Sequence, residues 1–228
     1  MTSRSKAFSG LAKLLVLVSL LTPLLVLVAV LATRMGFVDL KTGLGVLGLQ
    51  VAPVLAWIGA GAGLASLLLL IRNRSLWPYA AASVVIAAVS LGAVQYQLAR
   101  FGVAPRDVTT NDDDPPAFGR ALLSERRAAG VRPTHAVECE GLQAIESQLS
   151  PDVAAWALKQ SGVTVMGMSP FRVDGWQEGM WFGIQHDVTV RIRPGRTDIR
   201  VSGRDGLPIG PQACDLAKRL GAEMNALR

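Results

Sequence analysis

The sequence predicts two parts of different fold class: an anchor of three transmembrane helices, and a small α+β domain whose helices pack on one face of an antiparallel sheet. Three observations support this prediction. The first hundred residues contain three long apolar runs, the composition then becomes that of a globular domain, and apolar and polar residues alternate strictly near the carboxyl end. About 20 apolar residues are enough to cross the hydrocarbon core of a bilayer.

The expected membrane region covers residues 11–99 and follows a short cytoplasmic tail at 1–10. Its three apolar runs are 11–32, 44–71 and 77–99. Lys13 is the only charged residue within them. Ionisable side chains inside a span usually mark an ion or proton path, so their near absence argues against a pump or transporter. We therefore interpret the region as an anchor that is in contact with membrane lipids.

Most of the positive charge lies around these runs. Residues 1–100 contain eight basic residues and one acidic residue, whereas residues 101–228 contain fifteen and sixteen. The second half is nearly neutral, and we therefore expect no nucleic-acid binding. The tail and the loop before the third run hold slightly more basic residues than the opposite side. This bias predicts a cytoplasmic amino terminus and a carboxy-terminal domain on the opposite side, which in a bacterium is the periplasm. We therefore expect a bacterial inner-membrane protein with a periplasmic domain.

Two glycines of the second run, Gly59 and Gly63, have the spacing that lets helices approach closely. They could form a dimer face or pack against the other two spans. We favour packing within the three-helix unit, because three spans already need such contacts.

Residues 100–118 are expected to be a linker, and residues 119–228 the soluble domain. The linker holds three consecutive aspartates followed by two prolines, which favour an extended, solvated chain. The spaced oxygen ligands and the glycine of an EF-hand are missing, so we expect no calcium site. We also expect no other metal and no cofactor.

Four strands and three helices are expected in the soluble domain. The expected strands are 144–149, 163–169, 181–193 and 197–204, and the expected helices are 117–129, 151–161 and 212–227. The strand at 181–193 is the clearest, because its apolar residues alternate with polar ones and so share one face. In the last helix, a stripe of apolar residues is expected to face the sheet.

Three stretches, at 107–118, 181–194 and 201–220, resemble a bacterial and plastid family called domain of unknown function fourteen ninety-nine. The resemblance covers about residues 107–228, and some members of the family carry membrane spans ahead of the domain. The family has no established activity, so the resemblance implies none. The chain departs from the family pattern at His186 and Asp187, where two acidic residues are usual. It also departs in the loop after the last strand, where a serine and a later aspartate are missing.

The chemistry-bearing residues form no recognisable catalytic pattern. His186 and Asp187 are neighbours on a strand, so their side chains point to opposite faces and cannot act as a pair. We expect His186 to be a structural histidine. Cys139 and Cys214 do not have zinc-site spacing. In the periplasm they could form a disulfide, but two buried free thiols are nearly as consistent with the sequence.

Arginines gather on the outward side of the last hairpin: Arg191, Arg193, Arg196, Arg200 and Arg204. They could form a docking face for lipid headgroups, an acidic polymer or a partner protein. They could also belong to an exposed sheet face where aspartates balance the charge, which we favour. Trp181 could line a groove together with Trp176, or pack at the rim of the core.

The expected function is therefore that of a non-enzymatic inner-membrane protein whose periplasmic domain binds an envelope lipid or an envelope protein. One alternative is an envelope hydrolase that uses His186, Asp187 or Arg204. Another is a structural subunit of a membrane complex, joined through the second span. The sequence predicts no particular oligomeric state.

Overall fold

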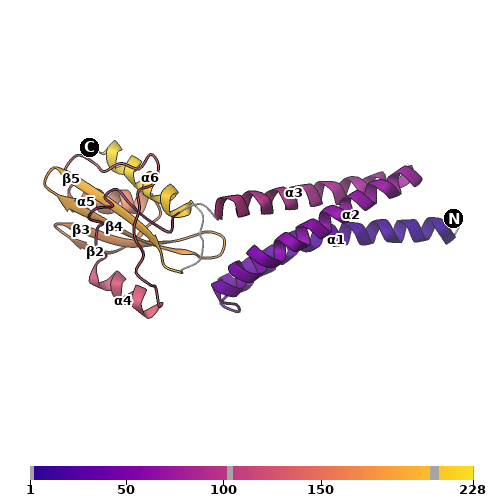
Figure 1. The fold of residues 1–228 in the computed structure, drawn as a ribbon, viewed down its shortest axis with the longest axis horizontal. Helices are drawn as coiled ribbons and strands as arrows, with labels where there is room; N and C mark the ends of the chain where they lie inside the picture. The colour runs from indigo at the N-terminus through magenta and orange to yellow at the C-terminus, as the bar shows by residue number, and fades with distance from the viewer. Residues whose placement is uncertain (1–2, 102–104, 206–210, 228) are drawn as a thin grey trace. The chain divides into compact units, whose positions relative to one another are not determined.

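The computed structural model describes residues 3–101, 105–205 and 211–227 (Figure 1). The chain divides into two compact units, residues 1–99 and 100–228. This division falls where the membrane region was expected to end. The predicted fold class is confirmed, since the first unit consists of long apolar helices and the second is an α+β domain.

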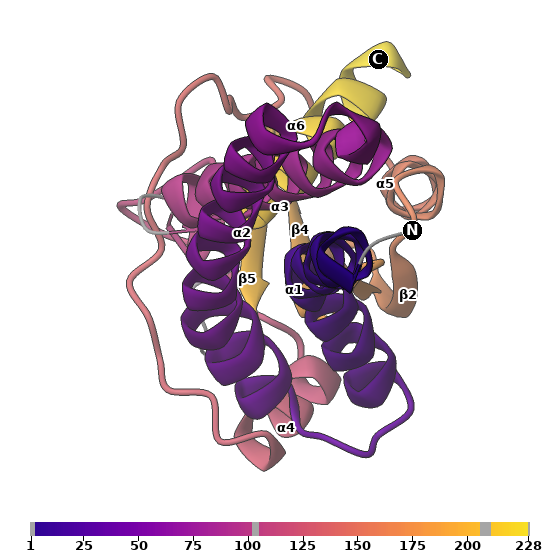
Figure 2. The same cartoon turned by 90° about the vertical axis from the view of Figure 1, so that its right-hand side faces the viewer.

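The described part of the first unit consists of helices joined by short turns. It consists of α1 (Ser3–Arg34), the π-helix η1 (Lys41–Val51), α2 (Ala52–Arg72), the 3-10 helix η2 (Arg74–Leu76) and α3 (Trp77–Phe101). Three of its segments are long and apolar enough to cross a membrane: Phe8–Arg34, Lys41–Arg72 and Arg74–Arg100. The second span thus begins earlier than expected, with eleven residues in the wider π-helical form. Figure 2 shows α1 and α2 side by side.

Small residues allow the three helices to come together. A Cβ atom at Gly59 would lie 3.6 Å from the Cα of Ser19 on α1, and one at Gly63 would lie 3.3 Å from the Cβ of Ala87 on α3. The hydroxyl groups of Ser19 and Ser83 are hydrogen-bonded at 2.8 Å, joining α1 to α3. Gly59 and Gly63 are therefore used for packing within the unit, the interpretation favoured from the sequence.

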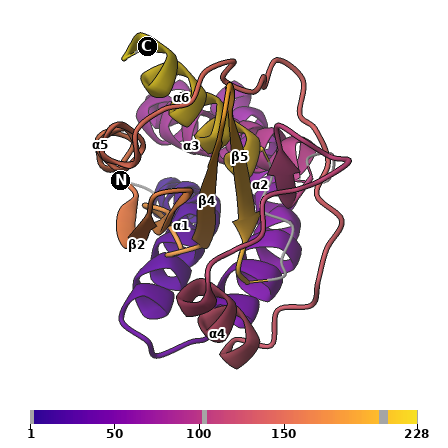
Figure 3. The ribbon, with the colours of Figure 1, turned by 90° about the vertical axis from the view of Figure 1, so that its left-hand side faces the viewer.

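The second unit is built on a five-stranded antiparallel sheet with strand order β1-β5-β4-β3-β2. The strands are β1 (Asp107–Thr109), β2 (Thr164–Ser169), β3 (Arg172–Glu178), β4 (Gln185–Arg193) and β5 (Arg196–Gly203). Its helices are α4 (Arg120–Ala128), α5 (Pro151–Gln160) and α6 (Gln212–Ala226). Helices α5 and α6 cover one face of the sheet, as expected, whereas α4 lies away from them on the other (Figures 1 and 3). The sequence predicted all helices on one face, and α4 differs because Arg126 holds it to Asp187 on the polar face.

The face beneath α5 and α6 carries the hydrophobic core. Val188 and Val190 of β4 and Ile199 of β5 are fully buried there. The expected stripe of α6 is buried as predicted: Ala213, Leu216, Ala217, Leu220 and Met224. Ser150 caps α5 by accepting a hydrogen bond from the backbone N–H of Val153, also as the sequence indicates.

Three expectations for this unit are wrong. Residues 100–118 are not a linker throughout, since they contain β1, which pairs with the end of β5. The expected strand at 144–149 is reduced to one bridge between Ile145 and Thr197. Strand β3 was not expected, because its alternation is obscured by charged residues and by Gly175. A side chain at Gly175 would collide with the carbonyl of Thr164 on β2, so only glycine fits between these strands.

Candidate functional site

The face of the sheet opposite α5 and α6 is polar and largely buried. Residues that lie directly across from each other share a face, so Asp187 of β4, Ser202 of β5 and Asp107 of β1 form one row. The side chains of these residues are almost completely buried. Strict alternation predicted a polar face here, but predicted it to be exposed. Helix α4 and the segment before it cover this face.

Two arginines from different elements meet at Asp187. Arg126 of α4 donates to Asp187 at 2.7 Å and to the hydroxyl of Ser202 at 3.0 Å. Arg204 donates from Nε to the same carboxylate at 3.0 Å. Burial lowers the pKa of Arg204, but its bonds and charge interactions with Asp187 and Glu125 outweigh burial and raise that pKa. The carboxylate is thus the point that fixes α4 to the sheet.

A second buried carboxylate, Asp198, collects three arginines of the last hairpin. Arg191 donates to it at 3.0 Å, Arg193 at 2.7 Å and Arg196 at 2.7 Å. Burial raises the pKa of Asp198, but the hydrogen bonds from Arg196 and Arg191 and the charge of Arg193 outweigh burial and lower it. These three arginines are therefore balanced by an aspartate of the same domain, as in the interpretation favoured from the sequence, although Asp198 itself is buried.

A third ion pair lies beside an aromatic ring. Arg200 donates to both oxygens of Asp107, at 2.9 and 2.8 Å, and to the carbonyl of Pro116 at 3.1 Å. The guanidinium carbons of Arg126 and Arg200 lie 4.6 and 4.8 Å from the centre of the Phe118 ring. Cations at this distance are attracted to the face of the ring. The segment before α4 is held to the sheet in this way.

A cleft of about 300 Å³ opens beside these groups, between α4, the chain that follows it and β5. It is lined by Ala117, Phe118, Leu123, Arg126, Arg127, Val131, Arg132, Pro133, Thr134 and Arg200. Four of the lining residues are arginines, and no carboxylate is among the described residues that line it. Arg126 and Arg200 are paired with the aspartates described above. Arg127 and Arg132 are exposed and form no ion pair with any described residue.

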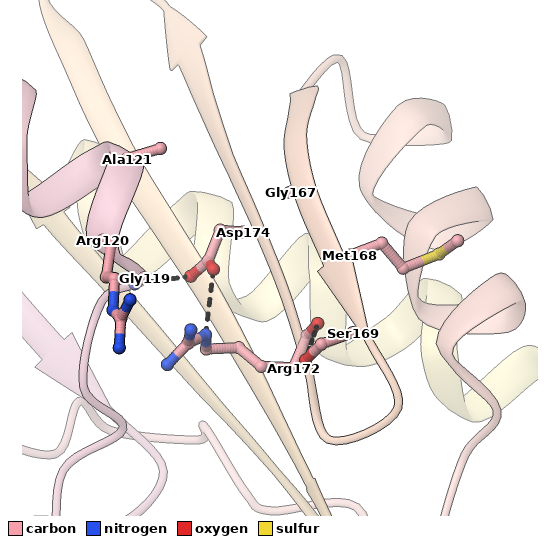
Figure 4. Close-up of a pocket in the computed structure, with 8 residues that line it drawn as sticks. All are labelled: Gly119, Arg120, Ala121, Gly167, Met168, Ser169, Arg172 and Asp174. Atoms are coloured by element: carbon pink, nitrogen blue, oxygen red, sulfur yellow. Dashed lines mark hydrogen bonds and ion pairs between the residues drawn. The ribbon is translucent and has the colours of Figure 1, made fainter.

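A smaller hollow near the amino end of α4 is structural in character. Asp174 accepts hydrogen bonds from the backbone N–H of Gly119 at 3.1 Å and from Arg172 Nε at 3.0 Å (Figure 4). Gly119 directly precedes α4, so this bond ties the start of the helix to β3. The volume of this hollow is about 180 Å³.

His186 and Asp187 point to opposite faces of the sheet, as predicted. His186 is buried on the apolar face, and its Nε2 has no hydrogen-bond partner among the described residues. Burial lowers the pKa of His186 to about 4, although Asp187 and the backbone of Ile184 act in the opposite direction. The side chain is therefore neutral at neutral pH. Among the described residues, no three His, Cys, Asp or Glu side chains are grouped to hold a metal ion.

The remaining predicted residues lie outside the cleft. Cys139 and Cys214 form a disulfide with their Cα atoms 6.0 Å apart, so the bonded alternative is the one found. Trp181 is exposed in the turn between β3 and β4, whereas Trp176 is half-buried on β3. The expected arginine–glycine loop after β5 lies partly at 206–210, outside the described residues.

Four residues that line the cleft were not predicted from the sequence: Phe118, Arg126, Arg127 and Arg132. One signal pointed to them, since the short stretch 120–132 contains four arginines against one glutamate. Arg120 and Arg127 are exposed on α4, while Arg126 is turned inward. The burial of Arg126 depends on Asp187, which is 61 positions away, so local sequence could not indicate it.

Comparison of the sequence and the structure with known proteins identifies no relative of this chain. No family model matches the chain, and neither curated proteins nor solved structures give a match. The resemblance to the family of unknown function therefore rests on the sequence motifs alone.

Proposed function

We propose that this protein is a membrane-anchored binding protein that holds an anionic phospholipid headgroup in the cleft beside α4. The observation that carries the proposal is the lining of four arginines around Phe118 with no carboxylate among the described lining residues. Arginine is well suited to phosphate, because its planar donors can form two parallel hydrogen bonds. Arg127 and Arg132 have donors that no described carboxylate uses.

The rest of the lining favours an anion that also has an apolar part. Leu123, Val131 and Pro133 supply apolar surface next to the guanidinium groups. A small inorganic ion would leave this surface in contact with water. The glycerol and the first acyl carbons of a phospholipid would cover it, which is a source of binding free energy. An acidic protein segment offers the charge but less apolar surface.

Chain connectivity also favours a ligand from the bilayer. Asp107, the partner of Arg200, comes six positions after Phe101, the last residue of α3. Six residues reach at most about 20 Å. If α3 spans the membrane, Asp107 stays within that reach of its end, and Asp107 holds Arg200, which lines the cleft.

We further propose that the spans lie in a bacterial inner membrane and that the domain is periplasmic. The small excess of basic residues on the side of the amino terminus supports this orientation. The bonded state of Cys139 and Cys214 also supports it, because disulfides persist in oxidising compartments such as the periplasm.

Native mass spectrometry of the full-length protein in detergent micelles tests the lipid proposal. Phosphatidylglycerol and phosphatidylcholine are titrated separately into the wild type, into Arg127→Ala/Arg132→Ala and into Arg120→Ala. Arg120 is the matched control, because it is an exposed arginine of the same helix that does not line the cleft. We expect one phosphatidylglycerol to bind the double variant about ten-fold more weakly, as loss of two exposed charge-assisted contacts implies. Arg120→Ala should bind like the wild type.

Two results would overturn the proposal. Equal retention of phosphatidylglycerol by all three proteins would place the bound lipid at the spans alone. A peptide of six glutamates serves as a second probe. If this peptide binds through Arg127 and Arg132 while phosphatidylglycerol does not, the ligand is an acidic protein segment and the lipid proposal is wrong.

A further inference from the structure

The turn between β3 and β4 presents two large apolar side chains to solvent. Met180 is 80% exposed and Trp181 is 68% exposed. The turn is closed by a 2.7 Å hydrogen bond from the N–H of Gly179 to the carbonyl of Ile184, and Ile184 is buried. Met180 and Trp181 are thus held outward by a short, anchored loop.

This turn lies at the end of the sheet where the chain enters the domain. Glu178 of β3 pairs with Gln185 of β4, next to the pair of His186 with Gly203 of β5. Asp107, the first residue of β1, pairs with Ser202 at this same end of β5. Neighbouring strands are about 4.8 Å apart, so the base of the turn is only about 10–15 Å from Asp107 along the sheet end.

The connection to α3 limits how far this end can be from a bilayer. Residues 102–106 connect Phe101 to Asp107, and a chain of this length spans at most about 20 Å. The headgroup region on each side of the hydrocarbon core is about 5–8 Å thick. A turn that projects beyond the sheet end is therefore within reach of the lipid headgroups.

We propose that Met180 and Trp181 insert into the headgroup region of the bilayer that holds the three spans. The occupant of this exposed apolar surface is the lipid interface. Tryptophan is suited to this position, because its ring is apolar while its N–H can bond to water and headgroups. The loop is a second membrane contact of the protein. It does not depend on the cleft, because neither residue lines it.

Fluorescence quenching in proteoliposomes tests the insertion with the full-length protein. The chain has five tryptophans, so the emission of one is obtained as the difference between the wild type and a single variant. Trp181→Phe reports Trp181. Trp156→Phe is the matched control, since Trp156 is a partly exposed tryptophan on α5. Each protein is measured in phosphatidylcholine vesicles with and without bromine atoms on the upper acyl carbons.

We expect brominated lipid to remove most of the Trp181 emission and little of the Trp156 emission. The Trp181 difference spectrum should also be shifted to shorter wavelength than that of Trp156. If Trp181 emits like an indole in water and brominated lipid leaves its intensity unchanged, the proposal is wrong. Circular dichroism of both variants checks that the fold is intact. The Arg127→Ala/Arg132→Ala variant should show the same quenching of Trp181 as the wild type, even if it no longer binds the headgroup. The quenching therefore tests the insertion of the loop independently of headgroup binding in the cleft.

Discussion

Replacing Asp187 with alanine would leave the buried guanidinium group of Arg126 without its carboxylate and that of Arg204 with Glu125 alone. The side chains of Arg126 and Arg204 are only 8% and 10% exposed, and that of Asp187 is fully buried. Removing one member of a buried ion pair costs about 3–5 kcal/mol, because the remaining charge stays desolvated. We therefore expect the α+β domain to lose about 3–5 kcal/mol of unfolding free energy in Asp187→Ala.

Hydrogen exchange by mass spectrometry measures this loss in the full-length protein. Slow amides of β4 and β5 exchange through unfolding of the domain, so their rates report its free energy. A loss of 3–5 kcal/mol corresponds to rates about 10² to 4 × 10³ times faster. Asp114→Ala is the matched control. Asp114 pairs with Arg191 but is 66% exposed, and an exposed pair contributes at most about 1 kcal/mol.

The reasoning would be refuted if Asp187→Ala and Asp114→Ala increased exchange by the same factor. That result would mean that the arginines at Asp187 find water or another acceptor when the carboxylate is gone. Asp187→Asn should fall between the two, because it keeps the shape and one acceptor but not the charge.

Three further predictions concern other parts of the chain. The pKa of His186 is about 4 in the folded domain, below its ordinary value of about 6.5, so the unfolded chain binds more protons between these values. The unfolding free energy of the domain should thus decrease by a few kcal/mol as pH falls from about 6.5 to about 4. Urea titrations should show a smaller decrease for His186→Gln than for the wild type over this pH range. Gly63→Leu should crowd Ala87 and so lower the melting temperature of the helical unit in detergent. Gly61→Leu is the control and should not lower it, because a Cβ at Gly61 meets nothing within 4 Å. Equal melting temperatures for the two variants would contradict the packing described. Removing the disulfide by Cys139→Ser/Cys214→Ser should lower the unfolding free energy by up to about 4 kcal/mol, because the bond closes a loop of 75 residues. A reductant should lower the melting temperature of the wild type but not that of the variant.

Elements with a strong local pattern could be predicted from the sequence. The apolar runs, the alternation along β4, the stripe of α6 and the serine cap of α5 each depend on residues close together in the chain. The structure places all four as expected, with differences of a few residues at the ends. Such patterns depend on a burial face that repeats every two or about 3.6 residues, which one sequence is enough to reveal.

The buried polar face of the sheet, opposite α5 and α6, could not be predicted in the same way. β1 has only three residues and lies next to an acidic, proline-containing stretch, so nothing local distinguishes it from a linker. Its burial depends on Arg200, which pairs with Asp107 across 93 positions. Likewise, Arg191 and Arg193 were expected to face solvent, because the sequence does not show that Asp198 is buried beneath them.

The position of β1 has a consequence for the order in which the protein is made. β1 leaves the ribosome directly after the third span, but its partner in the sheet, β5, follows about ninety residues later. Contacts this far apart in sequence form slowly, because a long loop must close first. The helical unit can assemble while the rest of the chain is still being synthesised. The sheet cannot be completed until β5 has emerged, so a nascent domain must keep its unpaired strands from aggregating until then.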